Sequence, residues 1–518
     1  MKKIEWMVAV GTAAALAGAL YSAGCQRTAS ECALLGACGE GGGGGGTSTS
    51  SASSATASST STASSTSTST SASSTTSSGT GGEAPVAFCE ARHYGGTGDE
   101  AVRSVHVDAS SSILFAGEHT GTFSLGLYNA VAQGKDLFVA KVGSSWDVQW
   151  LTSFPVTYGA VAYDASGDMV IAGSFANPVD FGCGNVLDAP DDLYVVKLKA
   201  DGKCGWVRGF SAPGANVRVA VDPAGQIALV GDGASGFDFH DTDAGPLVVP
   251  GGGGRDFFIA SLDPSGKVFF AKAYGGNGDD VINAVAFDDV GGVVVAGAFK
   301  SDKLQIGAGG NDLLHPAGGL DEAFVARFKG GSSSWIVGFP GSGAAQATGV
   351  AVAGGVPIVA GHFTGTMKLS AATTLTATGD DLFVLGINPN GSNPLVAWHQ
   401  AFLGTGAKTI AGFTSNGTDA LALTGSLDGD VNFGLGVLKA KEGAYFAKLS
   451  SATGKALSSH SFGSNDPLIT AEGIALEGST LYVAGGFGPS LDIGGSKVLQ
   501  NSSPSGTDLY VAKSCLLP

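Results

Sequence analysis

The chain has few charges, few cysteines and no segment with a helical apolar period. Only 14% of its 518 residues are charged, and the formal net charge is −17. A chain this acidic repels nucleic acid and anionic lipid, which argues against a general phosphate-binding role. Because 84 residues are glycine and 43% are hydrophobic without a 3.6-residue period, the composition favours short strands joined by tight turns.

Motifs that indicate catalysis or metal binding are also missing. No Gly-x-Ser-x-Gly phrase stands at a strand-to-helix elbow, and none of the 8 histidines forms a His-x-Glu or His-x-x-x-His pair. The spacing of a calcium-binding loop is absent, so we interpret these clustered acids as solvated loop residues: Asp238, Asp241, Asp243, Asp279 and Asp280. We therefore predict no catalytic motif, no metal site and no cofactor, and an enzyme is the less favoured class.

What the chain does contain is a phrase that recurs seven times. A short apolar run ends in glycine at Gly117, Gly173, Gly231, Gly297, Gly361, Gly425 and Gly485. The successive spacings are 56, 58, 66, 64, 64 and 60 residues. A nearly fixed period of this length is the signature of a repeat architecture.

Each repeat has four apolar runs separated by turn residues. In the first repeat the runs are 101–108, 113–118, 136–142 and 148–154, rich in Val, Ile, Phe and Trp. The turn after the first run recurs as Asp-x-x-Gly, which suits a type I hairpin turn. Four antiparallel strands per unit describe a propeller blade, so we predict an all-β, seven-bladed β-propeller over residues 86–518.

The two ends of the array complement each other. The seventh repeat stops after its third strand, Asp508 to Lys513, whereas Phe88 to Tyr94 is a spare fourth strand at the start. We predict that the N-terminal strand completes the last blade and removes the open sheet edge. Tryptophans recur near the fourth strands, and we attribute them to packing between blades: Trp146, Trp150, Trp206, Trp335 and Trp398.

The repeat resembles the bacterial β-propeller repeat family called SBBP. The matching phrases are Tyr94-Gly-Gly-Thr-Gly-Asp99, Tyr274-Gly-Gly-Asn-Gly-Asp279, Val-Ala-Gly and Asp136-Leu-Phe-Val-Ala-Lys141, the last recurring in most repeats. The third, fifth and sixth repeats depart from the Gly-Gly-x-Gly-Asp phrase. The resemblance implies a propeller and says little about activity.

The N-terminal part is predicted to be a targeting segment and a tether. Residues 1–24 resemble the signal peptide of bacterial lipoproteins, whose lipobox is matched by Ala23-Gly24-Cys25. This resemblance implies that Cys25 is lipidated, that 25–38 is the lipid-anchored N-terminus, and that Gln26 permits sorting to the outer membrane. Ordinary secretion with an unmodified Cys25 is the alternative. Residues 39–85 are almost wholly Gly, Ser, Thr and Ala, so we predict a disordered tether with an average reach of about 38 Å.

Six cysteines remain besides Cys25, an even number in an exported chain, so disulfides are expected. Fifteen connectivities are open, and the repeat register favours these three pairs: Cys32 with Cys38, Cys183 with Cys204, and Cys89 with Cys515. A recurring acid opens the third strand of most repeats: Asp136, Asp192, Asp256, Asp381 and Asp508. These rim acids would form a cation or ligand ring or, as we favour, would cap loops through backbone amides.

The sequence favours a monomeric binding or scaffolding protein of the cell envelope, facing the surface or the periplasm. Its ligand would be a protein or a glycan docked on variable loops, and the membrane would be met only through the lipid anchor. The loops that differ most between repeats are 126–134, 182–190, 238–255, 307–320 and 370–379. Two alternatives remain open: a hydrolase or lyase acting on extracellular polysaccharide or peptide, and a structural coat or adhesion component.

Overall fold

The structure is a computed structural model of the whole chain, and it describes residues 88–188, 191–233, 236–239, 253–306, 312–315, 319–390, 395–463, 468–493, 498–502 and 506–514. All of them belong to one compact unit, residues 67–518. The segments predicted to be the signal peptide, the lipid-anchored N-terminus and the tether lie outside the described residues. The part that is described is all-β and contains no helix.

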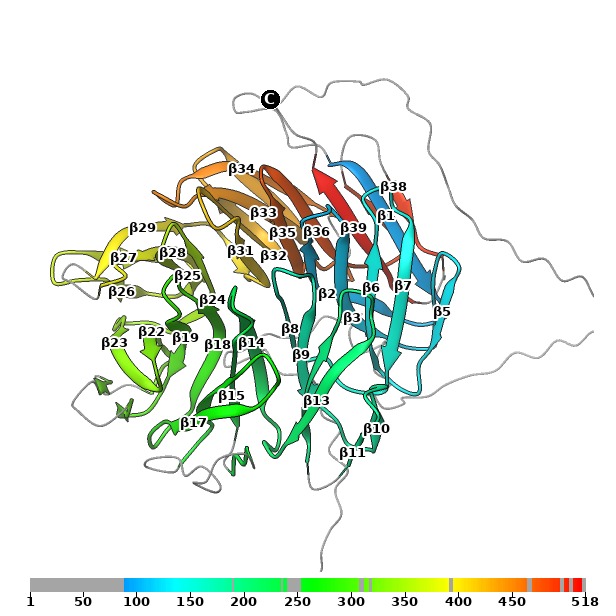
Figure 1. Cartoon of the computed structure of the whole chain (residues 1–518). Helices are drawn as coiled ribbons and strands as arrows, with labels where there is room; N and C mark the ends of the chain where they lie inside the picture. The colour runs from blue at the N-terminus through cyan, green and yellow to red at the C-terminus, as the bar shows by residue number, and fades with distance from the viewer. Residues whose placement is uncertain are drawn as a thin grey trace, which may run out of the picture. The chain divides into compact units, whose positions relative to one another are not determined.

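Seven antiparallel sheets of four strands form the blades of a propeller, as the sequence predicts (Figure 1). The innermost strands of blades 1 to 7 are β2 (Glu100–Val107), β8 (Ala160–Tyr163), β14 (Asn216–Val221), β18 (Asp280–Phe287), β24 (Ala345–Ala353), β31 (Gly412–Ser415) and β35 (Gly473–Glu477). The second strands are β3 (Ile113–His119), β9 (Met169–Ser174), β15 (Ile227–Gly233), β19 (Val293–Phe299), β25 (Val356–Phe363), β32 (Ala420–Asn432) and β36 (Thr480–Phe487).

The outer half of each blade follows the same order. The third strands are β6 (Asp136–Val142), β12 (Leu193–Leu198), β16 (Asp256–Leu262), β22 (Glu322–Lys329), β28 (Asp381–Ile387), β33 (Val437–Ser450) and β39 (Asp508–Ser514). The outermost strands are β7 (Val148–Phe154), β13 (Cys204–Phe210), β17 (Val268–Tyr274), β23 (Ser332–Gly338), β29 (Val396–Phe402), β34 (Ala456–Phe462) and β1 (Phe88–Gly96).

The propeller closes into a ring through contacts between its innermost strands and through the N-terminal strand, which completes the last blade. Each innermost strand contacts that of the next blade, and β35 contacts β2. Strand β1 completes the seventh blade by pairing with β39, from Phe88 opposite Ser514 to Tyr94 opposite Leu509. Figure 1 shows the blue N-terminal strand beside the red C-terminal one. The predicted closure is therefore confirmed, and seven apolar clusters fill the spaces between neighbouring blades.

The recurring glycine lies beneath an aromatic ring in every blade. Its register partner on the third strand is Phe138, Tyr194, Phe258, Phe324, Phe383, Tyr445 or Tyr510. A Cβ added at any of the seven glycines would lie 2.0–2.7 Å from a backbone carbonyl oxygen at the innermost strand. Where the ring is tyrosine, its hydroxyl donates to the carbonyl of Thr157, Thr409 or Thr470. The repeat thus needs a residue without a side chain to let three strands approach closely.

Tryptophans on the outermost strands join consecutive blades. Trp150, Trp206 and Trp335 donate their indole N–H to the carbonyls of Ala200, Pro264 and Pro389, at 3.2, 3.0 and 3.2 Å. Each acceptor belongs to the turn between the third and fourth strands of the next blade. The same ring covers the turn glycine at Gly202 or Gly266, both of which have positive φ. The predicted packing role of these tryptophans is confirmed, and we call this arrangement the indole staple.

Besides the four strands of each blade, the structure contains short hairpins that the sequence analysis did not predict. Short hairpins interrupt the connection between second and third strands: β4 (Thr122–Leu125) with β5 (Tyr128–Val131), β10 (Val179–Asp180) with β11 (Val186–Leu187), β20 (Lys303–Leu304) with β21 (Leu313–Leu314), β26 (Thr366–Lys368) with β27 (Thr374–Thr376), and β37 (Ser490–Asp492) with β38 (Val498–Gln500). In blade 6, β32 and β33 simply extend, and β30 (Gly406–Lys408) pairs with β32.

These hairpins form because their apolar residues alternate and are buried. Phe123 and Leu125 in the first hairpin are both fully buried, as are Leu304 and Ile306 in the fourth blade. Several described parts of the variable loops are therefore hydrogen-bonded β-hairpins. In blades 1, 4 and 5 the hairpin region also pairs with the chain leaving the preceding blade, where Gly95 pairs with Ser124, Gly275 with Gln305 and Gly341 with Met367.

Candidate functional site

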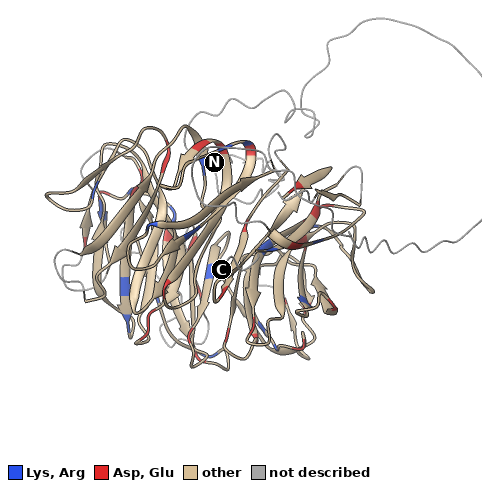
Figure 2. Cartoon of the chain, turned by 90° about the horizontal axis from the view of Figure 1, so that it is seen from above, with Lys and Arg blue, Asp and Glu red and all other residues tan. Residues whose placement is uncertain are grey.

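Two innermost strands carry a cation at equivalent positions near the start of the blade. Val102 pairs with the recurring Gly117, and Arg103 follows it in a bulge. Val217 pairs with the recurring Gly231, and Arg218 follows it. The equivalent residues of blades 4 and 5 are polar, Asn283 and Thr348. The innermost strands of these four blades thus carry polar side chains at one repeat position, while Figure 2 shows that Lys, Arg, Asp and Glu are otherwise scattered over the blades.

Arg103 is neutralised by carboxylates from two blades. Its guanidinium contacts Glu472 of blade 7 and donates to Glu118 of its own blade at 3.0–3.1 Å. Lys135, which is half-exposed, pairs with the same Glu118 at 2.8 Å. Burial opposes the charged form, but the two carboxylates outweigh it and raise the pKa of Arg103 above its usual value. A chain of charges therefore runs from Lys135 to the centre.

Arg218 has less compensation. Its Nε donates to the carbonyl of Asn283 at 3.0 Å and its Nη1 to the carbonyl of Val217 at 2.8 Å. In the described part of the chain it makes no ion pair within 4.0 Å, because Asp232 is bonded to Arg255 at 2.5–3.0 Å. Burial lowers the pKa of Arg218, and the more distant charge of Asp232 only partly offsets this. An additional carboxylate would therefore stabilise the charged guanidinium.

A tyrosine from blade 2 completes this group. Burial raises the pKa of Tyr158 beyond its usual value, and the hydroxyl is electrostatically coupled to Arg218, Glu472 and Arg103. The four residues come from blades 1, 2, 3 and 7, and we call them the axial cluster: Arg103, Tyr158, Arg218 and Glu472. Beside it, His106 stacks on Tyr163 with ring centroids 4.4 Å apart. The cluster offers hydrogen-bond donors and one under-compensated cation.

Sequence reasoning missed the axial cluster. It searched for motifs, and these residues are separated by up to 369 positions, as in the Arg103–Glu472 pair. A usable signal was present, since Arg103, Arg218 and Glu472 occupy the same repeat position, whereas blades 4 and 5 have uncharged Asn283 and Thr348 there. Positions that break a repeat are better candidates for function than positions that define it.

The rim acids are positions that define the repeat. Asp136 accepts the backbone N–H groups of Gln133 and Gly134, and Asp381 accepts those of Thr378, Gly379 and Gly404, at 2.6–3.3 Å. Asp192, Asp256 and Asp508 likewise accept the N–H of Ala212, Gly276 and Ser502. These carboxylates cap loops, and a residue used in this way in several blades is built for the fold.

Two rim acids face another acid across a blade interface. The charge of Asp508 acts on Glu100, and that of Asp280 acts on Asp256, where the Gly-Gly-x-Gly-Asp phrase is intact. Burial, reinforced by the charges of Asp508 and Asp99 and opposed by the Gly96 N–H, raises the pKa of Glu100 to about 8. Burial also raises the pKa of Asp256 to about 7 and that of Asp280 to about 6. Glu100, Asp256 and Asp280 are shielded from solvent, which favours their protonated forms.

We expect the fold to lose stability as the pH rises from about 4.5 to about 8. In this window folded Glu100 keeps a proton that the unfolded chain, with its ordinary pKa of 4.5, has released. Because the pKa of Glu100 is higher in the folded state, the free energy of unfolding falls as the pH rises. Each unit of difference between the folded and unfolded pKa corresponds to about 1.4 kcal/mol. The other titratable groups at this seam are Asp99, Asp508, His93 on Asp508, and buried His119, whose pKa burial lowers.

Urea unfolding at pH 5 and pH 8 checks this expectation. Glu100→Gln should reduce the loss of unfolding free energy between pH 5 and pH 8, whereas substitution of the exposed Asp289 by asparagine should leave this loss unchanged. Stability that rises between these pH values in the parent chain would contradict the assignment.

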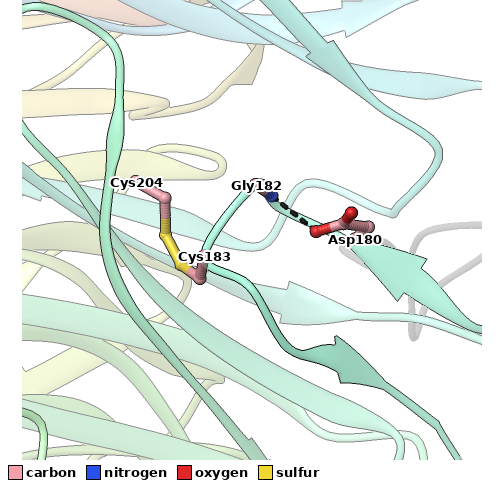
Figure 3. Close-up of a disulfide and its surroundings, with 4 residues drawn as sticks. All are labelled: Asp180, Gly182, Cys183 and Cys204. Carbon is pink, nitrogen blue, oxygen red and sulfur yellow. Dashed lines mark hydrogen bonds between the residues drawn. A yellow bond between two sulfur atoms is a disulfide. The ribbon is translucent and has the colours of Figure 1, made fainter.

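One predicted disulfide is present. Cys183 and Cys204 are bonded, with Cα atoms 5.2 Å apart, and join the hairpin of blade 2 to its outermost strand (Figure 3). Asp180 accepts the N–H of Gly182 at 2.7 Å beside it. The thiol of Cys89 lies 3.7 Å from the carbonyl of Lys513, while Cys515 lies outside the described residues. Cys25, Cys32 and Cys38 also lie outside them.

The residues that the structure describes offer neither a metal site nor a membrane-spanning helix. No group of three or more His, Cys, Asp or Glu side chains there could hold a metal ion. No helix in that part is long and apolar enough to cross a membrane. Asp241 and Asp243 are outside the described residues, as is most of the variable segment 238–255.

Comparison with known proteins gives no identification. No family model and no curated protein matches the chain. A protein of unknown function from Dyadobacter fermentans aligns at 11% identity and a TM-score of 0.35, over 83% of this chain and 99% of its own. Apo AztD from Citrobacter koseri aligns at 10% identity and a TM-score of 0.34, over 82% of this chain and 99% of its own. Acylaminoacyl peptidase from Pyrococcus horikoshii aligns at 9% identity and a TM-score of 0.39, over 78% of this chain and 52% of its own. These values carry no inference about activity.

Proposed function

We propose that the protein is an exported lipoprotein that binds a protein or a glycan at the cell envelope through the axial cluster. The lipobox-like residues before Cys25 and the Gly/Ser/Thr-rich segment 39–85 support display on a tether. The repeat phrases support membership of the SBBP type. The propeller itself fits a binding, scaffolding or hydrolase-like role, because this fold does not determine function.

The proposal rests on the environment of Arg218. It is a partly enclosed cation without an ion pair in the described structure, and Tyr158, Asn283 and Arg103 lie around it. A carboxylate would supply the missing charge and could form a bidentate hydrogen bond with the guanidinium. We therefore infer that the ligand carries a carboxylate, as an acidic sugar or an acidic peptide does.

The hydrolase alternative has less support. Its paired acids would have to reach a substrate, yet Asp256 is 2% exposed and Asp280 is fully buried. A coat or adhesion role would require self-association, and no observation on the described surface favours it. The binding role is therefore the one that we develop.

Arg218→Gln should weaken binding of a uronate-containing polysaccharide or an acidic peptide at least tenfold. The reason is the loss of a charge-assisted, bidentate contact. Calorimetric titration of the full chain in detergent measures this, with a neutral polysaccharide as the ligand control. Arg208→Gln is the matched protein control, because Arg208 lies on outermost strand β13 and donates to the Gly266 carbonyl at 3.2 Å. Equal affinities for parent and Arg218→Gln would refute the proposed site.

A further inference from the structure

The interface between blades 3 and 4 lacks the indole staple. In blades 1, 2, 4 and 5 the outermost strand has a bulge, and a tryptophan follows it at Trp150, Trp206, Trp335 and Trp398. In blade 3 the bulge falls between Val268 and Phe270, so Phe270 holds the tryptophan position. Phenylalanine has no N–H to donate to the next blade.

The residue within the same bulge is also unusual. It is Gln149, Gly205, Ser334 or Ala397 in those four blades, Leu457 in blade 6 and Cys89 in blade 7, so Phe269 of blade 3 is the one aromatic residue at this position. Phe269 is 52% exposed and meets Phe270 edge-on, with centroids 5.4 Å apart. Exposure of a large aromatic ring is unfavourable, so its place beside the missing staple calls for an explanation.

The facing turn of blade 4 is shortened as well. It is the two-residue turn Gly330–Gly331, with φ of 58° and 75°, which suits a tight type I′ hairpin. In blades 2 and 3 the equivalent turns span Lys199 to Lys203 and Asp263 to Lys267. Phe270 reaches the shorter turn, since a Cβ on Gly331 would lie 3.3 Å from its ring. Phe270 therefore packs on the shorter turn with a smaller ring than the indole that packs on Gly202 or Gly266.

The result is a hollow of about 290 Å³ between the two blades. Its walls include Phe269, Phe270, Phe287, Phe328, Lys329 and Gly331. This volume is at the lower end of ligand pockets, about 300–1,000 Å³, so it suits one ring rather than a larger molecule. The edge-to-face surfaces of the phenylalanines and the ammonium of Lys329 are complementary to a flat, electron-rich ring.

We propose that this hollow binds a tryptophan side chain presented by a partner polypeptide. The chain itself shows which group fits beside such a turn, because an indole packs on the equivalent turn at three other interfaces and donates its N–H to a turn carbonyl. Three departures from the repeat coincide here: the exposed Phe269, the replaced staple at Phe270 and the short turn. The site is separate from the axial cluster and does not depend on it.

Titration of the full chain in detergent with a blocked Gly-Trp-Gly peptide carrying 5-fluorotryptophan, followed by ¹⁹F NMR, tests the proposal. We expect a saturable shift of the peptide resonance. Phe270→Trp should weaken binding at least tenfold, because the new indole would occupy the hollow as the other staples do. Trp335→Phe is the matched control at the next interface and should leave binding unchanged.

A second variant keeps the test decisive if Phe270→Trp folds poorly. Phe269→Ser introduces the bulge residue of blade 4 and should also weaken binding at least tenfold. Absence of a saturable shift with the parent chain would overturn the proposal. Binding that persists undiminished in the folded variants would overturn it too, because the peptide would then occupy another place.

Discussion

Replacement of Gly361 by valine is expected to reduce the free energy of unfolding by about 3–5 kcal/mol. A Cβ at this position would lie 2.0 Å from the Gln346 carbonyl oxygen and 2.6 Å from the Phe383 ring. Neither the innermost strand nor the buried ring can withdraw without separating neighbouring blades. Since whole domains are stable by only about 5–15 kcal/mol, the change should produce a large shift in the urea midpoint.

Gly134→Val provides the matched control for this substitution. The nearest atom to a Cβ at Gly134 is 4.0 Å away, and the residue lies in an exposed loop. Its effect should stay within about 0.5 kcal/mol. If both valines had the same small effect, the packing role assigned to the recurring glycine would be wrong.

Lys408→Met should destabilise the fold by about 3–5 kcal/mol, because it leaves the charge of Asp381 without its buried partner. The two side chains are both fully buried, and Nζ lies 3.2 Å from the carboxylate across the interface between blades 5 and 6. Hydrogen bonds from Thr378, Lys408 and nearby amides together overcome burial and lower the pKa of Asp381. Without Lys408 this pKa should rise.

A double-mutant cycle with Asp381→Asn measures the coupling. The effect of the double variant should be smaller than the sum of the two single effects by at least about 1 kcal/mol. Lys439→Met is the control, because Lys439 is 74% exposed and lies 3.9 Å from Asp430, so its loss should change stability little. Additive single effects at Lys408 and Asp381 would show that the pair is not coupled.

The sequence predicted the ring because the recurring glycine occurs in every repeat and the Asp-x-x-Gly turn occurs in the second, third and fourth. The glycine period, the Asp-x-x-Gly turns and the missing fourth strand each report a local requirement, so Phe88 to Tyr94 could be matched to the seventh blade. The short hairpins were missed, although the alternation around Phe123 and Leu304 indicated them. Those runs are only two to four residues long and resemble loop.

The candidate sites were harder to predict than the fold. Arg103 and Glu472 meet only because the ring closes, and no local spacing encodes that contact. Phe270 is an ordinary apolar residue until the register shows that four other blades have tryptophan there. Both sites are visible as departures from the repeat once the blades are superimposed in register.

The most direct test of the binding role is site-specific photo-crosslinking in intact envelopes. A photoreactive residue in place of the exposed Gln133, two residues before Lys135, would report on the side of the ring that leads to the axial cluster. The same residue in place of Leu457, which is 44% exposed on outermost strand β34, is the control. We predict a discrete adduct from position 133 alone, lost in Arg218→Gln. An identical pattern from both positions, or an adduct insensitive to Arg218→Gln, would contradict the account.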